Sequence, residues 1–405
     1  MSLSLATEFI DLLKRSRLLT EEQVEGALWS HSLQHTEDPL AVANGLVKAR
    51  LLTKYQAQEL LFGNWQHLVI DNYAVQYILG AGGMGWVYCA RELDSEWEMA
   101  IKLLSRDRRD DDGMLARMQM EGEAGLRLKH PNILRTFSIN RTEDNYGYLN
   151  YMVMEMVRGI TPLELLWLEK KIDIAHACDI IRQAAIGLQY AHDNALVHRD
   201  VKPDNLMIRS NGAVKILDFG LAMRNDTDDE FSMAMIFGQD RVGTADYVAP
   251  EQTINSYHID HRADVYGLGC TFYTILASQV PFPYSTARKK LIGHRKKKPT
   301  PLREMRPDVP KDVAAIISKM MSKSPDRRFQ TCGEVARVLE PLSETREVKF
   351  NFKKMTKLRV KHAKKREAMK RKQSQTSVVS VSDLEIKPPV PEVETKVRKD
   401  TDLDD

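Results

Sequence analysis

The chain contains few of the residues that build disulfide scaffolds or zinc sites. Its 405 residues include only four cysteines, and no two of them show the C-x-x-C spacing of a zinc or redox pair. Scattered cysteines of this kind indicate reduced residues in a core. They are Cys89, Cys178, Cys270 and Cys332.

Long apolar runs are also missing. The longest candidate, residues 267–280, ends at Pro281 and is shorter than the ~20 residues that a membrane-spanning helix needs. It fits a buried helix instead. Charged residues such as Glu8 and Asp11 interrupt the first 20 positions, which does not fit a secretory leader. We therefore expect a cytoplasmic protein without a transmembrane anchor.

The charge balance excludes a strongly basic or acidic protein. There are 59 Lys and Arg against 56 Asp and Glu, so the formal net charge is only +3. This balance argues against nucleic-acid binding as the main role. The length predicts ~2–3 domains, and 43% apolar residues are enough for a sizeable core.

Two short motifs carry the chemistry of phosphoryl transfer. Residues 198–205 read His-Arg-Asp-Val-Lys-Pro-Asp-Asn, and Asp-Phe-Gly follows at 218–220. Moving a phosphoryl group requires a base near the acceptor hydroxyl and oxygen ligands for magnesium. Asp200, Asn205 and Asp218 suit these needs. Isolated loop Asp and Asn residues often form Asx turns, but that interpretation does not explain the joint spacing.

A glycine-rich stretch precedes these motifs. Gly80, Gly82 and Gly85 have G-x-G-x-x-G spacing, and glycine lets the backbone approach phosphate oxygens closely. The triplet alone is weak, because dinucleotide folds use it at the start of a helix. Here residues 86–90 continue as a β-type run, and Met-Ala-Ile-Lys follows at 99–102.

In this order, and with the later segments 249–251, 264–269 and 325–329, the motifs resemble the protein kinase superfamily. The resemblance covers roughly residues 68–342 and is specific for the eukaryotic-type Ser/Thr kinases of bacteria. It implies an α+β, two-lobed fold with a β-rich N-lobe, a helical C-lobe and ATP between them. The expected cofactors are ATP and Mg²⁺, with Mn²⁺ as an alternative.

The resemblance also implies the nucleotide site. Lys102 would hold the phosphates and pair with a glutamate on the helix before His130. We favour Glu121 over Glu123, because the residue one turn later is then the small Gly125, although this leaves the local packing thin. The full set of expected ATP-binding residues is Leu79, Gly80, Gly82, Gly85, Val87, Ala100, Lys102, Glu121, Met154, Glu155, Met156 and Met207.

Catalytic and metal roles follow from the same resemblance. Asp200 would accept the proton of the substrate hydroxyl, and Lys202 would neutralise charge on the transferring group. Asn205 and Asp218 would bind the metal ions. Lys202 and Thr244 are typical of Ser/Thr kinases rather than tyrosine kinases.

Residues 218–251 would form the activation segment. Arg199 precedes the catalytic Asp200, a pattern that predicts pairing with a phosphate on this segment, and Thr227 and Ser232 are the candidate acceptors. Four acidic residues around Thr227 could partly mimic that phosphate. A solvent-exposed loop surface without a regulatory role would explain these acidic residues equally well.

Residues 1–66 contain an internal repeat of period 33. Arg-Leu-Leu-Thr occurs at 17–20 and again at 50–53, and each threonine is followed three residues later by a glutamine, which predicts a capping box. We expect a four-helix accessory module that packs on itself or on the small lobe. Its role could be partner binding, regulation or a structural cap.

Residues 343–405 change in composition. Between positions 353 and 372 there are eleven basic residues and one acidic residue, and then come Ser-rich, Pro-containing and acidic stretches. We expect a disordered tail with at most a transient basic helix and weak electrostatic contact with acidic surfaces. Autophosphorylation at Thr376, Ser377, Ser380 or Ser382 would weaken that contact.

The leading interpretation is a Ser/Thr protein kinase that also phosphorylates itself, with self-association between copies. The alternatives are a pseudokinase scaffold acting through the helical module, a nucleic-acid-binding protein using the basic tail, and a small-molecule kinase. The intact set of Lys102, Asp200, Asn205 and Asp218 argues against a pseudokinase, and the segment at 249–251 favours a protein acceptor. The protein substrates cannot be read from the motifs.

Overall fold

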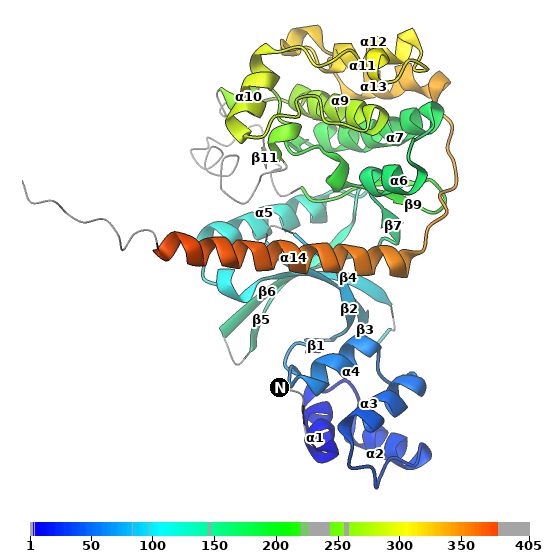
Figure 1. Ribbon diagram of the computed structural model, residues 1–405, viewed down its shortest axis with the longest axis vertical. Coiled ribbons are helices and arrows are strands. Elements are labelled where there is room, and N and C mark those ends of the chain that lie inside the picture. Colours follow the sequence, from blue (N-terminus) through cyan, green and yellow to red (C-terminus); the bar gives the residue numbers. More distant parts are fainter. Residues whose placement is uncertain are drawn as a thin grey trace, which may run out of the picture. The chain divides into compact units, whose positions relative to one another are not determined.

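The computed structural model describes residues 3, 5–82, 84–95, 97–144, 147–219, 223–224, 244–254 and 259–379. The chain divides into two compact units, Met1–Val360 and Lys361–Asp405. In the second unit the described residues, 361–379, form the later part of helix α14 (Phe352–Val379). The first unit contains the N-terminal helices, the sheet and the helical part that follows it (Figure 1).

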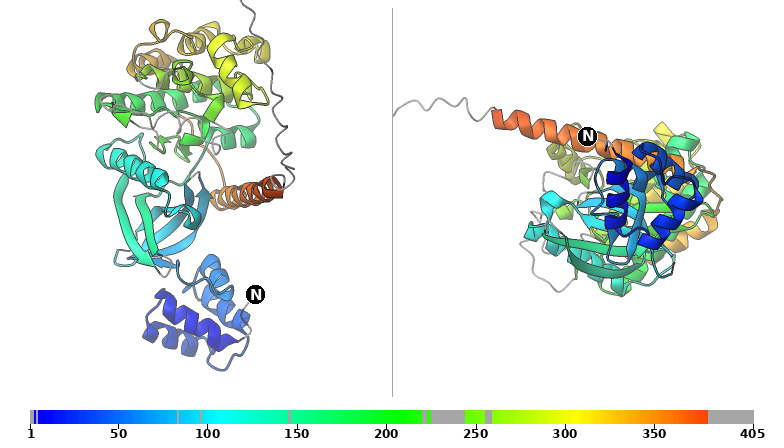
Figure 2. Two further views of the ribbon diagram at one scale, coloured as in Figure 1. Left: turned by 90° about the vertical axis from the view of Figure 1, so that its left-hand side faces the viewer. Right: turned by 90° about the horizontal axis from the view of Figure 1, so that it is seen from below.

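The N-terminal module consists of four short helices. They are α1 (Ala6–Ser16), α2 (Glu21–Ser30), α3 (Pro39–Lys48) and α4 (Lys54–Leu61). Thr20 caps α2 and Thr53 caps α4, each in a complete capping box with a glutamine at the third helical position. The apolar faces meet around buried Phe9, Leu46 and Leu60. Figure 2 shows these helices gathered into one bundle that runs on into the sheet.

The second repeat attaches this module to the sheet. Thr53 Oγ1 donates a hydrogen bond to the carbonyl oxygen of Gln76, and Gln56 Nε2 donates to that of Val75, both at 2.8 Å. The equivalent Thr20 and Gln23 of the first repeat are exposed. The same capping motif is therefore structural in one copy and solvent-facing in the other.

The small lobe is an antiparallel sheet in the order β1-β2-β3-β4-β6-β5. Helix α5 (Asp112–Arg127) packs on it, and α4 contacts its strand β2. Gly122 and Gly125 allow close packing, since a Cβ on Gly125 would lie 2.2 Å from Thr136 Oγ1. The packing is therefore tight, which corrects the expectation of a thin contact at Gly125. The strands are β1 (Val69–Ile70), β2 (Tyr73–Ala81), β3 (Gly85–Glu92), β4 (Glu98–Leu104), β5 (Thr136–Asp144) and β6 (Gly147–Glu155).

The larger lobe is helical. Its central helix, α9 (Arg262–Ala277), is buried along nearly its whole length, as the apolar run from residue 267 predicts. The other helices are α6 (Pro162–Glu169), α7 (Ile174–Asp193), α10 (Ala287–Lys296), α11 (Leu302–Met305), α12 (Lys311–Met320) and α13 (Cys332–Leu339). Short strands complete it: β7 (Gly159–Ile160), β8 (Leu196–Val197), β9 (Leu206–Arg209), β10 (Val214–Ile216) and β11 (Met223–Arg224). The two-lobed α+β architecture is thus confirmed.

Six short 3₁₀ turns connect these elements among the described residues. They are η1 (Arg106–Arg108), η2 (Pro203–Asn205), η3 (Thr244–Asp246), η4 (Glu251–Thr253), η5 (Pro325–Arg327) and η6 (Glu340–Leu342). Of these, η2 lies in the segment with the first phosphoryl-transfer motif, and η3 lies in the expected acceptor stretch. The expected base and the expected acceptor stretch therefore lie on loops and short turns.

The segment after η6 differs from the expectation of a structureless tail. Residues 343–360 belong to the same compact unit as both lobes, and Val348 and Met355 are buried in the large-lobe core. The reason is that apolar residues are interspersed among the basic ones and find a place on that core. The described helices include none that is long and apolar enough to cross a membrane.

Candidate active site

A buried ion pair joins the sheet to α5. Lys102 on β4 donates to both carboxylate oxygens of Glu121, at 2.6 and 2.7 Å. Glu123, the competing glutamate, instead accepts a hydrogen bond from Gln119 on an exposed face. Asp218 also lies near Lys102, with 3.7 Å between Nζ and Oδ2. The structure thus brings together three of the expected site residues.

The electrostatics of this cluster follow from burial and shared charge. Burial alone would lower the pKa of Lys102, but Asp218 and Glu121 raise it above its ordinary value. Burial and the charge of Asp218 raise the pKa of Glu121 to about 8. Burial opposes ionisation of Asp218 as well, yet Lys102 holds its pKa well below the usual range. Two carboxylates share one ammonium, so the cluster has an excess of acidic groups.

The glycine-rich stretch forms the turn between β2 and β3. A Cβ added to Gly80 or Gly82 would meet nothing within 4 Å. At Gly85 it would lie 2.0 Å from the carbonyl oxygen of Leu103, so this glycine is needed for the approach of two strands. The three glycines therefore have different roles: the first two face open space that a ligand could fill, and the third is structural.

Most of the expected adenine residues gather in one apolar cluster, which does not include Met207. Ala100 and Met154 are buried in one apolar cluster, and Leu79, Val87 and Met156 pack against it. Met154 and Glu155 end strand β6, which leads into the segment between the lobes. The Glu155 carboxylate is paired with Lys215 at 2.8 Å, so its side chain turns toward the large lobe.

The loop from His198 to Asn205 holds the proposed base. Lys202 Nζ donates to Asp200 Oδ2 at 2.7 Å. Asn205 Nδ2 donates to the carbonyl oxygen of Asp200 at 2.8 Å, which leaves the amide oxygen of Asn205 available to a metal ion. These contacts fix the Asp200 carboxylate between a cation and an amide.

Asp264 on α9 binds the backbone of this loop. Its two oxygens accept hydrogen bonds from the backbone N–H groups of His198 at 2.8 Å and Arg199 at 2.7 Å. His192 Nε2 lies 2.8 Å from Asp264 Oδ2, and Arg199 has a positive φ of 62°. Although burial opposes it, the hydrogen bond to His192 keeps the pKa of Asp264 below its ordinary value. The motif at residues 264–269 contains Asp264 but does not by itself indicate this role.

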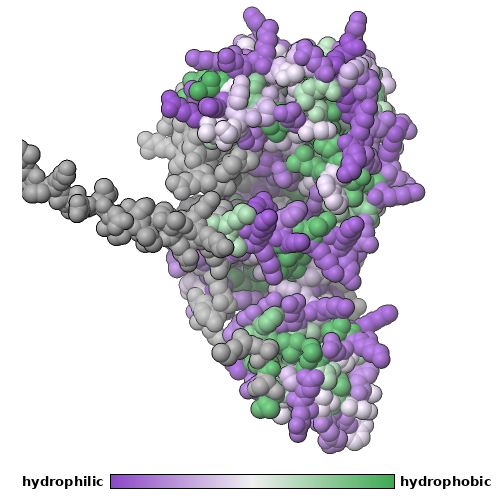
Figure 3. Space-filling model, in the orientation of Figure 1, coloured by the Kyte–Doolittle hydropathy of each residue, from purple (hydrophilic) through white to green (hydrophobic). Residues whose placement is uncertain are grey.

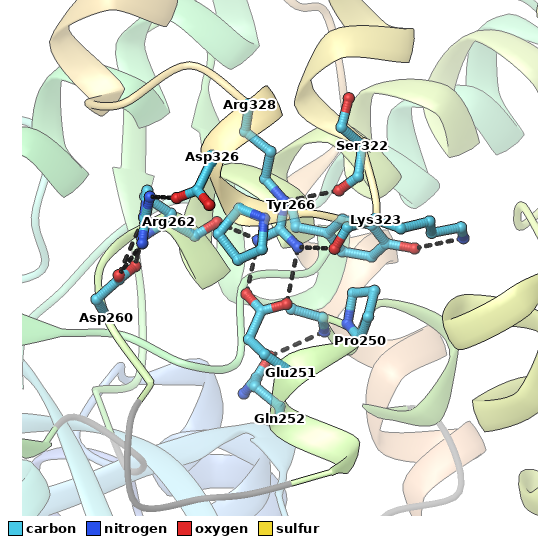
Figure 4. A network of polar contacts seen from close by, with 12 residues as sticks. Pro250, Glu251, Gln252, Asp260, Arg262, Tyr266, Ser322, Lys323, Asp326 and Arg328 are labelled. Atoms are coloured by element: carbon cyan, nitrogen blue, oxygen red, sulfur yellow. Dashed lines mark hydrogen bonds and ion pairs between the residues drawn. The ribbon is translucent and has the colours of Figure 1, made fainter.

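A second missed network fixes the end of the activation segment. Figure 4 shows the Arg328 side chain pointing at the Glu251 carboxylate, with Tyr266 beside it. Arg328 is fully buried, and both ends of its guanidinium reach Glu251, at 2.6 and 2.7 Å. Gln252 then links the segment to the base loop by donating to the carbonyl oxygen of Arg199 at 3.0 Å.

The structure describes only some of the residues that are expected to have regulatory roles. Thr227 and Ser232 lie outside the described residues. The backbone of Thr244 begins η3, and its side chain is not described. Arg199 is described, and its Nη2 lies 3.5 Å from the carbonyl oxygen of Ile259. The role of these residues in a phosphorylated state stays a prediction.

A protein kinase domain model matches residues 73–337. The chain belongs to the protein kinase domain family. The match covers both lobes of the structure and contains every expected ATP, metal and catalytic residue. It excludes the four-helix module and the segment after α13.

Several curated serine/threonine-protein kinases are similar to this kinase domain. The chain is 35% identical over 271 residues to "Serine/threonine-protein kinase PknB" of Mycolicibacterium smegmatis, which covers 67% of this chain and 42% of that protein. The protein of the same name from Mycobacterium tuberculosis is 34% identical over 265 residues, with coverages of 65% and 42%. The chain thus spans less than half the length of these relatives.

The residues of the kinase domain fit the nucleotide and metal that the family uses. Open space faces Gly80 and Gly82, and the excess of carboxylates around Lys102 suits a divalent cation. No group of three or more His, Cys, Asp or Glu side chains forms a self-contained metal site among the described residues. Asn205 and Asp218 would therefore share a metal ion with phosphate oxygens and water, as Mg²⁺ sites commonly do.

Proposed function

We propose that this protein phosphorylates serine and threonine residues of proteins, using ATP and Mg²⁺. One observation carries the proposal: Lys102 is already paired with Glu121 and lies 3.7 Å from Asp218, the expected metal-binding aspartate. The base Asp200 is likewise already held by Lys202 and Asn205. In protein kinases the lysine–glutamate pair and the metal-binding aspartate must both be in place for transfer. The names of the relatives support the serine/threonine class.

The chain's residues divide the chemistry between them. Bound ATP would supply the γ-phosphoryl group, and ADP would leave as the bond between the γ-phosphorus and the bridging β,γ-oxygen breaks. Asp200 orients the acceptor hydroxyl and takes up its proton as the new O–P bond forms. Lys202, 2.7 Å from Asp200, offsets negative charge on the transferring group. Lys102 positions the phosphates, and Glu121 fixes the direction of the Lys102 side chain.

The test is transfer of labelled γ-phosphate to the protein itself and to a generic acceptor. Asp200→Asn preserves size but removes the proton acceptor, so we expect turnover to fall by ~10²–10⁴-fold. ATP affinity should stay near that of the wild type. The matched control is Asp312→Asn on α12, where an exposed carboxylate accepts a hydrogen bond from the backbone N–H of Val313 at 2.8 Å, which the oxygen of an asparagine amide can also accept. Full transfer by Asp200→Asn would refute the assignment.

Location and partners extend the proposal. We infer a cytoplasmic protein, because all four cysteines are free and buried, as expected in a reducing compartment.

We further propose that copies associate and phosphorylate one another, and that the basic residues from 353 onward contact acidic surfaces weakly. Phosphosite mapping of mixed active and Asp200→Asn chains tests the first point, since phosphate on the inactive chain requires transfer between copies.

A further inference from the structure

The segment that follows the kinase-family match returns to the outside of the nucleotide site. Figure 1 shows it passing from α13 beside β9 and β7 to the start of α14. The backbone N–H of Glu344 donates to the carbonyl oxygen of Ala175 at 3.1 Å, and that of Val348 donates to Ser210 at 2.8 Å. Val348 is only 2% exposed. These contacts tie the segment to the large lobe.

The first turns of α14 are held just as firmly. Met355 is 3% exposed and Thr356 is 6% exposed, and Leu358 packs on the large-lobe core. Phe352 lies under the guanidinium of Arg158, which belongs to the segment linking β6 to α6. We call residues 154–161 the hinge segment, because they connect the two lobes. One end of α14 is thus in contact with the hinge segment.

Arg359 makes the closest contacts with this region. Its Nε donates to Glu164 Oε1 at 2.6 Å, and its Nη2 donates to Glu164 Oε2. The same Nη2 donates to the carbonyl oxygen of Gly159 at 2.9 Å and lies 4.0 Å from Met207 Sδ. Gly159 belongs to the hinge segment, and Met207 is an expected adenine contact. Arg359 therefore touches the outer side of the nucleotide site at two points.

Glu164 passes this contact on to the hinge segment. It is the third residue of α6, and its Oε2 accepts a hydrogen bond from the backbone N–H of Thr161 at 2.8 Å. Thr161 Oγ1 in turn accepts from the N–H of Glu164. Arg359, Glu164 and Thr161 form one chain of bonds that ends on the hinge backbone. A bidentate arginine restricts both partners more than a single contact would.

We propose that residues 343–360 form a hinge clamp, and that Arg359 is a positioning residue for nucleotide binding. The clamp preorganises the hinge backbone by holding Glu164 and the Gly159 carbonyl group in place. Nucleotide then binds without first ordering this region, which strengthens its affinity. The clamp rests on the proposed function, since it assumes that nucleotide binds beside Met207. It also assigns a role to residues outside the kinase-family match.

Isothermal titration of the full-length chain with magnesium ADP tests the clamp without any turnover. We expect Arg359→Ala to raise the Kd for ADP about tenfold, which corresponds to ~1.4 kcal/mol. Arg359→Lys keeps the charge but loses the bidentate geometry, so its Kd should be intermediate. Arg366→Ala is the matched control, because Arg366 is exposed two turns further along the same helix. Its Kd should equal that of the wild type.

A second variant keeps the proposal testable if Arg359→Ala fails to fold. Glu164→Gln retains an oxygen for the Thr161 N–H but removes the charge that attracts Arg359, and it should weaken ADP binding in the same direction. Melting curves without nucleotide report on stability alone. If Arg359→Ala melts earlier yet binds ADP as tightly as Arg366→Ala, the clamp is only structural and the proposal fails. A wild type that binds ADP but transfers no phosphate would overturn the proposed function and leave the clamp standing.

Discussion

The buried guanidinium of Arg328 allows the sharpest stability prediction. All five of its N–H groups are used: two reach Glu251, and the others reach the carbonyl oxygens of Arg262, Ser322 and Lys323. Arg328→Ala would leave three carbonyl groups without this donor and a carboxylate without its counter-charge. Removing one partner of a buried ion pair costs ~3–5 kcal/mol. At ~2–4 °C per kcal/mol for a large domain, the melting midpoint should fall by roughly 10 °C.

The neighbouring Arg327 provides a matched control. Its side chain is exposed, so Arg327→Ala should change the free energy of unfolding by less than ~0.5 kcal/mol. Urea denaturation of both variants measures the difference. Glu251→Gln combined with Arg328→Ala should cost less than the two single changes added together, because both remove the same interaction. If Arg328→Ala and Arg327→Ala differed by less than ~1 kcal/mol, the network in Figure 4 would not stabilise the fold as argued.

Two further predictions concern pH and backbone space. Burial, aided by the charge of Lys323, lowers the pKa of His294 to about 3, so the folded state disfavours its protonation. Its contribution to stability is complete above the ordinary pKa of 6.5 and is lost as pH falls from there toward 3. His294→Gln should therefore show a shallower loss of unfolding free energy than the wild type between pH 7 and 5, and equal slopes would contradict this. Gly85→Ala should cost ~1–3 kcal/mol of stability because its Cβ collides with the Leu103 carbonyl oxygen, whereas Gly82→Ala should leave melting unchanged and weaken only ADP binding. Paired melting and titration experiments separate the two glycines.

The motif residues could be anticipated from the sequence because the chemistry fixes both their types and their spacing. The choice between Glu121 and Glu123 also depended on spacing, since only one of them has a glycine one turn later. The reason for that glycine was not accessible. The reason lies in the fold, where Thr136 of β5 packs against Gly125. No local sequence pattern connects these two residues.

Other site residues depend on contacts over long sequence distances. Arg327 and Arg328 are adjacent and chemically identical in the sequence, and only the fold decides that the second is buried against Glu251. Arg359 is one of eleven basic residues in a stretch whose composition suggests disorder. Its partner Glu164 lies almost two hundred positions earlier, as the separation of 195 residues shows. The composition of such a segment describes its basic residues together, so it does not identify the one that makes a specific contact.

The attachment of the helical module also covers part of an edge of the sheet. Strand β1 pairs with only Tyr73 and Ala74 of β2, so the next carbonyl groups of that edge strand would be open to another chain. Gln56 and Thr53 occupy the carbonyl groups of Val75 and Gln76. An uncovered edge strand is a template for pairing between molecules. The second repeat thus covers this edge of the sheet with the end of a helix. A chain trimmed to residues 73–337 would expose an edge strand that the whole protein keeps covered.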